Sequence, residues 1–139
     1  MRKLVLISLL AGAGAGCGKA KDARSEDVEA APAALVKLTV DELDRQLASH
    51  ACQAVDANGT ETRRRMGVIP GAVLLTDADS IDKLPPDKAK GLVFYCANEA
   101  CSASHHAARK AIAAGYTNVR ILPDGIAGWV KAGKRTASI

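Results

Sequence analysis

The sequence predicts a small α/β domain, with a mostly parallel sheet and helices on both of its faces. Two observations carry this prediction. Segments typical of strands alternate along the chain with segments typical of helices, which is the order of β-α units around a parallel sheet. In addition, residues 91–96 form a continuous run of β-formers, as expected for a central strand buried on both faces. With 139 residues, the chain has room for one such domain.

The first seventeen residues have the order of a secretory signal peptide. Arg2 and Lys3 precede a short apolar run, and small residues then lead to Cys17. The apolar run is too short for an ordinary membrane-spanning helix. A cysteine at this place resembles the lipidation site of a bacterial lipoprotein signal, although Gly14 stands where such signals usually have leucine. The resemblance implies an exported, membrane-anchored lipoprotein that faces the periplasm or the cell exterior; plain secretion is the alternative.

Residues 18–34 are charged and rich in alanine, and they lack a sustained apolar face. We expect them to form a flexible tether, with the folded domain over residues 35–136. The net charge of +4 does not indicate a nucleic-acid partner, because no stretch interleaves basic with aromatic residues. We therefore expect no nucleic acid among the partners.

The first part of the domain is predicted to contain a helix, a strand and a turn. Thr39 and Glu42 have the spacing of a capping box, which marks the start of the helix. Residues 52–57 are expected to form a short strand whose regular part ends at Asp56. Residues 59–67 are polar and turn-like, with at most one helical turn.

The middle of the domain is predicted to supply two more strands. Pro70 and Gly71 indicate a turn, and a buried strand at 72–75 follows it. Residues 80–90 connect the two strands, because their double proline does not allow a long helix. The central strand at 91–96 comes next.

The last part of the domain is predicted to be helix, strand and helix. Ser102 is a candidate cap for the first of these helices, and Gly115 is its expected stop. A strand at 118–122 follows, and a short final helix is expected at 125–133.

Cys96 is a candidate nucleophile, because it lies at the carboxyl end of the predicted central strand. Open parallel sheets bind ligands beyond this end of their strands, and Asp56 lies at the same end of another strand. The thiolate is the reactive form of cysteine, and the backbone N–H groups of residues 97–102 can turn inward to stabilise it. The alternative is a buried structural cysteine, and position alone does not decide between the two.

Four segments resemble the rhodanese domain family, in the same order along the chain. Residues 68–75 are similar to the family's "GHIPGA" segment, and residues 56–58 stand where the family has Asp-x-Arg. Residues 93–104 correspond to its active-site loop and the following helix. Residues 114–133 are similar to the characteristic end of the family, "GGIxxWxxAG". The resemblance covers residues 35–136 and implies a rhodanese-like fold.

Rhodanese-like enzymes carry a sulfur atom as a persulfide on the loop cysteine, a position that Cys96 matches. The resemblance implies a sulfurtransferase in which Cys96 takes sulfane sulfur from a small donor, thiosulfate or a polysulfide, and passes it to a thiophilic acceptor such as a thiol. This chemistry requires no metal or organic cofactor. Asp56 is expected to brace the neighbouring loops. The other residues of the expected active-site loop are Ala97, Asn98, Glu99, Ala100, Cys101 and Ser102.

Several positions depart from the family's common pattern. The loop has Ala97, Glu99 and Cys101 where the family often has arginine, glycine, and arginine or threonine, and Asn58 replaces the arginine of the strand motif. These differences remove cationic partners of an anion and add a carboxylate, which argues against efficient use of thiosulfate. Related phosphatases have five residues between their cysteine and an arginine. This chain has Ser102 at the arginine position, so a phosphatase is not expected.

Cys101 is a possible second thiol, five residues from Cys96. It can resolve a persulfide or sulfenate on Cys96 by forming a disulfide, which would persist in an oxidising compartment. Whether the two sulfurs meet is left open by the sequence. Cys52 is expected to be unpaired and structural. One alternative function is therefore thiol–disulfide exchange or redox sensing by Cys96 and Cys101, and another is a non-enzymatic binding module with this fold.

A metal site is not predicted. Cys96, Cys101 and His105 carry atoms that bind soft cations, but their spacing matches no established zinc motif. We expect a half-buried His105 beside an apolar helix face and a solvated His106 instead.

The remaining notable residues are expected to be structural. Ala108 and Ile112 should pack the helix that follows the loop onto the core. Residues 63–65, three arginines, are expected in a solvated turn, and Trp129 in the core.

Overall fold

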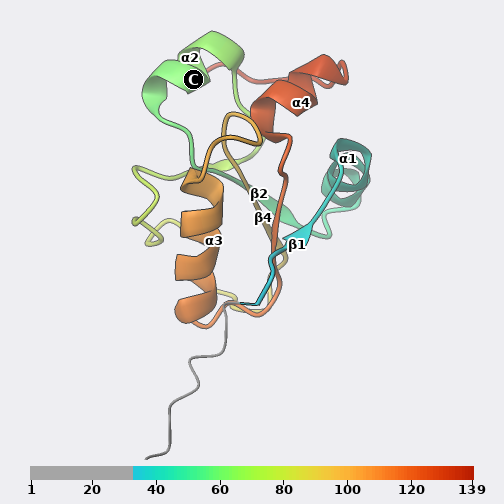
Figure 1. Ribbon diagram of the computed structural model, residues 1–139. Coiled ribbons are helices and arrows are strands. Elements are labelled where there is room, and N and C mark those ends of the chain that lie inside the picture. The colour runs from blue at the N-terminus through green and yellow to red at the C-terminus, as the bar shows by residue number, and fades with distance from the viewer. Residues whose placement is uncertain (1–32) are drawn as a thin grey trace, which may run out of the picture. The chain divides into compact units, whose positions relative to one another are not determined.

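The computed structural model describes residues 33–139, which fold around a five-stranded sheet (Figure 1). The strands are β1 (Val36–Lys37), β2 (Gln53–Asp56), β3 (Val73–Leu74), β4 (Leu92–Tyr95) and β5 (Val119–Ile121). The helices are α1 (Val40–Ala48), α2 (Thr60–Met66), α3 (Ala103–Ala113) and α4 (Gly125–Lys131). The expected signal peptide, Cys17 and the tether up to residue 32 lie outside the described residues. None of the helices in 33–139 is long and apolar enough to span a bilayer.

The sheet has the strand order β1-β5-β4-β2-β3, and each pair of neighbouring strands is parallel. The predicted α/β class and the central position of β4 are thereby confirmed. β1 was not predicted. Val36 and Lys37 are both exposed and pair with Arg120 and Ile121, so this strand depends on its neighbour and carries no hydrophobic pattern of its own.

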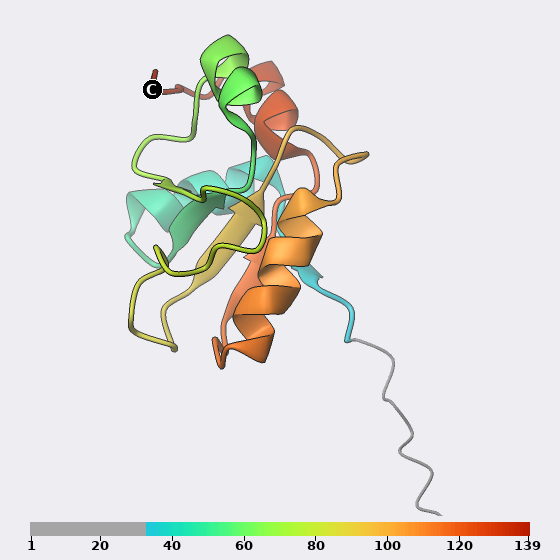
Figure 2. The ribbon, with the colours of Figure 1, turned by 90° about the vertical axis from the view of Figure 1, so that its left-hand side faces the viewer.

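Successive side chains of the central strand point to opposite faces of the sheet and enter two separate cores. On one face, Phe94 packs with Ala107 of α3. On the other, Tyr95 packs with Leu43 of α1 and Trp129 of α4. Figures 1 and 2 show α3 on one side of the sheet and α1 on the other. Both faces are covered by helices, as predicted.

The predicted cap of α1 is present, whereas Ser102 begins α3 without a side-chain capping hydrogen bond, and one predicted packing residue of α3 is exposed. Thr39 accepts the N–H of Glu42, and the Glu42 carboxylate accepts the N–H of Thr39, which completes the capping box of α1. On α3, Ala108 is buried as expected, but Ile112 is 47% exposed. Alanines fill the narrow space between α3 and the sheet, and Ile112 lies outside it.

The segment after β2 is helical over seven residues, from Thr60 to Met66, and is therefore longer than the single turn predicted. Arg64 and Arg65 are exposed, as expected for a solvated segment. The prediction was wrong for Arg63, which is 8% exposed. The helical period turns this one arginine toward the sheet while its neighbours face solvent.

Candidate active site

The carboxyl ends of the two central strands form the floor of the candidate site. Asp56 ends β2 and pairs in register with Tyr95, which ends β4. The chain continues from Tyr95 directly into Cys96, which is 1% exposed and belongs to the core on the α3 side. The predicted nucleophile therefore begins the loop that joins β4 to α3, with its side chain turned inward.

Cys96 and Cys101 form a disulfide. Their Cα atoms are 6.3 Å apart, a separation typical of a disulfide. Cys101 is partly exposed, whereas Cys96 is buried. The loop is thus short enough to bring together the two sulfurs whose meeting the sequence left open.

Asn98 organises the turn between the two cysteines. Its carbonyl accepts the N–H of Cys101 at 3.1 Å, and its side-chain oxygen accepts the N–H of Ala100 at 3.0 Å. Within the described residues, no N–H of positions 97–102 donates to the Cys96 sulfur, so the predicted inward cradle of N–H groups is not present in this disulfide state. Two of those groups are already bonded to Asn98, because the loop folds back to bring Cys101 to Cys96.

Ser104 is the polar side chain that meets the Cys96 sulfur. It lies in the first turn of α3, is 3% exposed, and places its Oγ 3.5 Å from Cys96 Sγ. Ser104 was not among the residues predicted from the sequence. The periodicity of the sequence could have identified Ser104 as a residue of the packed helix face. The spacing i, i+3, i+4, i+7 of one face is shared by Ser104, Ala107, Ala108 and Ala111. Ser104 is therefore a polar residue on the face that packs against the sheet.

The start of α4 holds the other end of the loop. The N–H of Ile126 donates to the carbonyl of Cys96 at 2.8 Å, and the N–H of Ala127 donates to the carbonyl of Ala97 at 2.9 Å. Gly125 precedes these donors with a φ of +60°. The loop backbone is thus fixed from the side opposite to α3.

Asp56 lies in a buried polar cluster beside the loop. One carboxylate oxygen accepts the N–H of Asn58 at 2.7 Å and the Nε of Arg63 at 3.1 Å. Arg63 also donates to the carbonyls of Asp56 and Leu75, at 3.0 and 2.8 Å. The cluster joins β2, α2 and the end of β3, and the Asp56 carboxylate makes no hydrogen bond with Cys96. This geometry suits a structural support.

Tyr95 lies on the other side of this cluster. Burial raises the pKa of its hydroxyl, and the negative charge of Asp56 raises it further. The hydroxyl therefore stays neutral at physiological pH, and it accepts the buried N–H of Ile69 at 3.0 Å. The bond ties the "VIPGA" segment to the base of the active-site loop.

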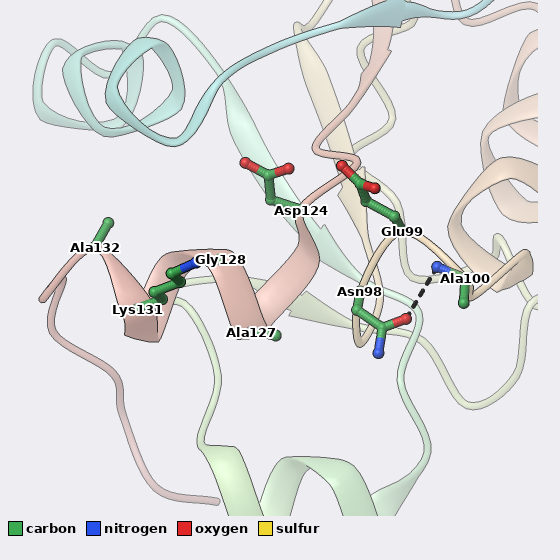
Figure 3. Close-up of a pocket in the computed structure, with 8 residues that line it drawn as sticks. All are labelled: Asn98, Glu99, Ala100, Asp124, Ala127, Gly128, Lys131 and Ala132. Atoms are coloured by element: carbon green, nitrogen blue, oxygen red, sulfur yellow. Dashed lines mark hydrogen bonds between the residues drawn. The ribbon is translucent and has the colours of Figure 1, made fainter.

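A groove of about 750 Å³ runs between the loop and α4 (Figure 3). Its walls are Asn98, Glu99, Ala100, Asp124, Ala127, Gly128, Lys131 and Ala132. Figure 3 shows the carboxylates of Glu99 and Asp124 on the same side of the groove, one from the loop and one from the start of α4. Glu99 is exposed and faces the groove, so an anion approaching along it meets two carboxylates.

The histidines next to the loop are placed apart from each other. His105 is half-buried and lines a hollow together with Cys101. His106 is exposed and lies 2.8 Å from Asp79, whose carboxylate also pairs with Lys110 at 2.9 Å. These two partners lower the pKa of Asp79. Among residues 33–139, no three His, Cys, Asp or Glu side chains are grouped as metal ligands would be.

Cys52 is buried beneath the opposite end of the sheet and has a free thiol. Burial raises the pKa of this thiol, so the reactive thiolate fraction is smaller than that of an ordinary cysteine. We expect iodoacetamide at pH 7.5 to leave Cys52 unlabelled in the folded protein and to label it once urea unfolds the chain. Peptide mapping measures this, and rapid labelling before unfolding would contradict it.

Comparison with known proteins shows which family this chain is related to. The sequence model of the family described as "Rhodanese-like domain" matches residues 39–132. A search of curated proteins finds no relative. A crystal structure of a rhodanese-like domain protein from Staphylococcus aureus is 28% identical, with a TM-score of 0.57 over 68% of this chain and 91% of that one.

Two further solved structures are similar in fold. A protein of unknown function from Rhodopseudomonas palustris, described as a possible tyrosine phosphatase, is 27% identical, with a TM-score of 0.61 over 73% of this chain and 84% of that one. Thiosulfate sulfurtransferase from Pseudomonas aeruginosa is 21% identical, with a TM-score of 0.62 over 73% of this chain but 20% of that protein. The family match extends over most of the chain and includes the whole β4–α3 loop, and the protein therefore belongs to the rhodanese-like domain family.

Proposed function

We propose that this protein is a sulfurtransferase that carries sulfane sulfur as a persulfide on Cys96 and passes it to a thiophilic acceptor. The observation that carries the proposal is the position of Cys96, buried at the carboxyl end of the central strand in a rhodanese-like domain. Ser104 lies beside the sulfur of this cysteine, and the start of α4 holds the backbone carbonyls of Cys96 and Ala97. Asp56 braces the neighbouring segment between β2 and α2 through its bonds to Arg63 and Asn58.

The chemistry needs two half-reactions at one sulfur atom. In the first, the Cys96 thiolate attacks the sulfane sulfur of thiosulfate or a polysulfide, and the remainder of the donor leaves with the bonding electrons. In the second, an acceptor thiolate attacks the outer sulfur of the persulfide, and the Cys96 thiolate leaves. The disulfide must be reduced before the first step, because a disulfide-bonded sulfur has no thiolate.

Intact-mass spectrometry tests the proposal on the reduced protein. After incubation with thiosulfate or with a polysulfide, we expect one added sulfur atom on the wild type and none on Cys96→Ser. Cys101→Ser should also gain the sulfur, and a longer lifetime in that variant would show that Cys101 normally discharges it. No added sulfur from either donor on the wild type would reject the proposal.

The carboxylates of the groove are expected to slow loading from an anionic donor. Because thiosulfate is a dianion, we expect Glu99→Gln combined with Asp124→Asn to raise the rate of loading from thiosulfate roughly two- to fivefold at low salt. The gain should shrink as ionic strength rises, since these exposed charges are screened. Single-turnover loading rates at two salt concentrations measure it, and Asp87→Asn, exposed and remote from the groove, is the control. Equal rates in all three proteins would contradict the role of the groove.

The disulfide favours one second candidate, a thiol–disulfide or redox-sensing protein that uses Cys96 and Cys101. This function requires reversible oxidation at a defined potential and no transfer of sulfur. Titration against glutathione mixtures, with loss of two hydrogens read by mass, tests it. A protein that cycles in this way and never gains sulfur would be assigned to the second candidate.

We also propose that the chain is exported and lipidated at Cys17, with residues 18–34 as a tether for a domain at 35–136. The order of residues in the first seventeen positions supports this. So does a disulfide in the domain, since disulfides persist mainly in oxidising compartments. Expression with labelled palmitate should label the wild type in the membrane fraction. Labelling that survives Cys17→Ser would contradict lipidation at this residue.

A further inference from the structure

We propose that the disulfide is opened in one direction: an incoming thiolate attacks Cys101, and Cys96 leaves as a thiolate that accepts a hydrogen bond from Ser104. The step concerns the disulfide itself. It can be measured without a sulfur donor, so it succeeds or fails independently of persulfide transfer.

Access determines which sulfur can be attacked. Cys101 lines a hollow of about 210 Å³ whose other walls are Glu99, Ala100, Ser102 and His105. Cys96 is 1% exposed and is covered by α3 and the core of the sheet. Disulfide exchange requires the attacking sulfur to reach the sulfur that it attacks. In the disulfide state, the CH₂–SH end of a small thiol can enter the hollow and reach Cys101, whereas Cys96 is covered for as long as the bond is intact.

The leaving sulfur needs stabilisation, because burial alone disfavours a thiolate. Ser104 supplies a hydroxyl donor 3.5 Å from Cys96 Sγ, and its own 3% exposure keeps water from competing for it. The carbonyl of Cys101, 3.2 Å from the same sulfur, cannot donate, so it does not stabilise negative charge there. Ser104 is thus the side chain in contact with the atom on which the charge develops, and we assign it as a catalytic residue for this step.

Opening the disulfide takes two exchange steps, and each of them forms one bond to sulfur and breaks another. The thiolate RS⁻ forms a bond to Cys101 Sγ, the Cys96–Cys101 bond breaks, and its electron pair stays on Cys96. A second RS⁻ then attacks the R-side sulfur of the mixed disulfide, which releases RSSR and the Cys101 thiolate. Two electrons pass from two small thiols to the two cysteines. The product is the reduced loop with a free Cys96.

Mapping the mixed disulfide on the unmodified chain tests the direction. The oxidised protein is mixed with glutathione, quenched in acid with N-ethylmaleimide, and cleaved after Glu99, which separates Cys96 from Cys101. We expect glutathione on the peptide that contains Cys101 and maleimide on the one that contains Cys96. Glutathione found mainly on Cys96, or equally on both, would overturn the proposal.

Variants test the role of Ser104. Ser104→Ala should slow release of the Cys96 thiolate about tenfold. A factor of this size corresponds to the loss of one hydrogen bond to a charged group. It should also move the rise of thiolate absorbance at 240 nm in the reduced protein to higher pH. Ser138→Ala, at an exposed residue outside the loop and the hollow, is the matched control and should react like the wild type. Ser104→Thr keeps the hydroxyl and should restore the titration.

A purely structural Ser104 gives a different result. In that case Ser104→Ala would change the unfolding midpoint, measured by the fluorescence of Trp129, and would leave both the exchange rate and the thiolate titration equal to those of Ser138→Ala. That outcome would remove Ser104 from the chemistry even if glutathione were found on Cys101.

Discussion

Replacing Arg63 with alanine is expected to destabilise the fold by about 3–5 kcal/mol, the cost of leaving one member of a buried ion pair alone. Asp56 is fully buried, and Arg63 is the cation that meets its carboxylate. The same guanidinium donates to the carbonyls of Asp56 and Leu75, so its removal also leaves backbone acceptors without partners. Urea unfolding followed by the fluorescence of Trp129, the only tryptophan of the chain, measures the loss.

The neighbouring residue provides the control. Arg64 has the same side chain as Arg63 and lies on the same helix, but it is exposed and makes no ion pair within residues 33–139. Arg64→Ala should change the free energy of unfolding by about 0.5 kcal/mol or less. Should Arg63→Ala prevent folding, Arg63→Lys keeps the charge, loses the second nitrogen that reaches the carbonyls, and should fall between the two. Similar stabilities for Arg63→Ala and Arg64→Ala would disprove the buried pair.

Arg63 also shows where prediction from the sequence reaches its limit. The strands β2, β3, β4 and β5 could be predicted because each contains β-forming apolar residues and lies between turn signals. Helix α2 is polar except for Met66 at its end, so it has no apolar face that would reveal which arginine turns inward. Which arginine is buried is decided by the position of Asp56 in the fold, seven residues earlier in the chain.

The candidate site could be predicted in part for a similar reason. The position of Cys96 at a strand end could be predicted because the residues before it form a continuous apolar run, a pattern that is visible in the local sequence. Two features depend on how the loop folds around Asn98: the disulfide, and the absence of N–H groups that donate to the Cys96 sulfur. Residue types alone do not determine this fold of the loop. Ser104 is an intermediate case, since a polar residue on the alanine face of α3 can be recognised from periodicity, but its contact with Cys96 requires the packing of α3 on the sheet.

Gly125→Ala is expected to have the second large effect, on both stability and the reactivity of Cys96. A Cβ at this position would lie 2.5 Å from the carbonyl oxygen of Cys96 and 2.7 Å from the backbone of Ala97. The added atom must push apart the loop and α4, which breaks the hydrogen bonds from Ile126 and Ala127. Adding the strain of a positive φ to the cost of overpacking gives a loss of about 2–5 kcal/mol.

A glycine in a similar backbone conformation separates the two causes. Gly71 has a φ of +77°, against +60° for Gly125, but a Cβ there would meet no atom within 4 Å. Gly71→Ala should therefore show the backbone strain alone, about 1–2 kcal/mol, and load sulfur at the wild-type rate. Gly125→Ala should lose more stability and load more slowly, because the carbonyl that α4 holds belongs to Cys96 itself. If the two variants proved equal in unfolding and in loading, the start of α4 would have no part in positioning the sulfur.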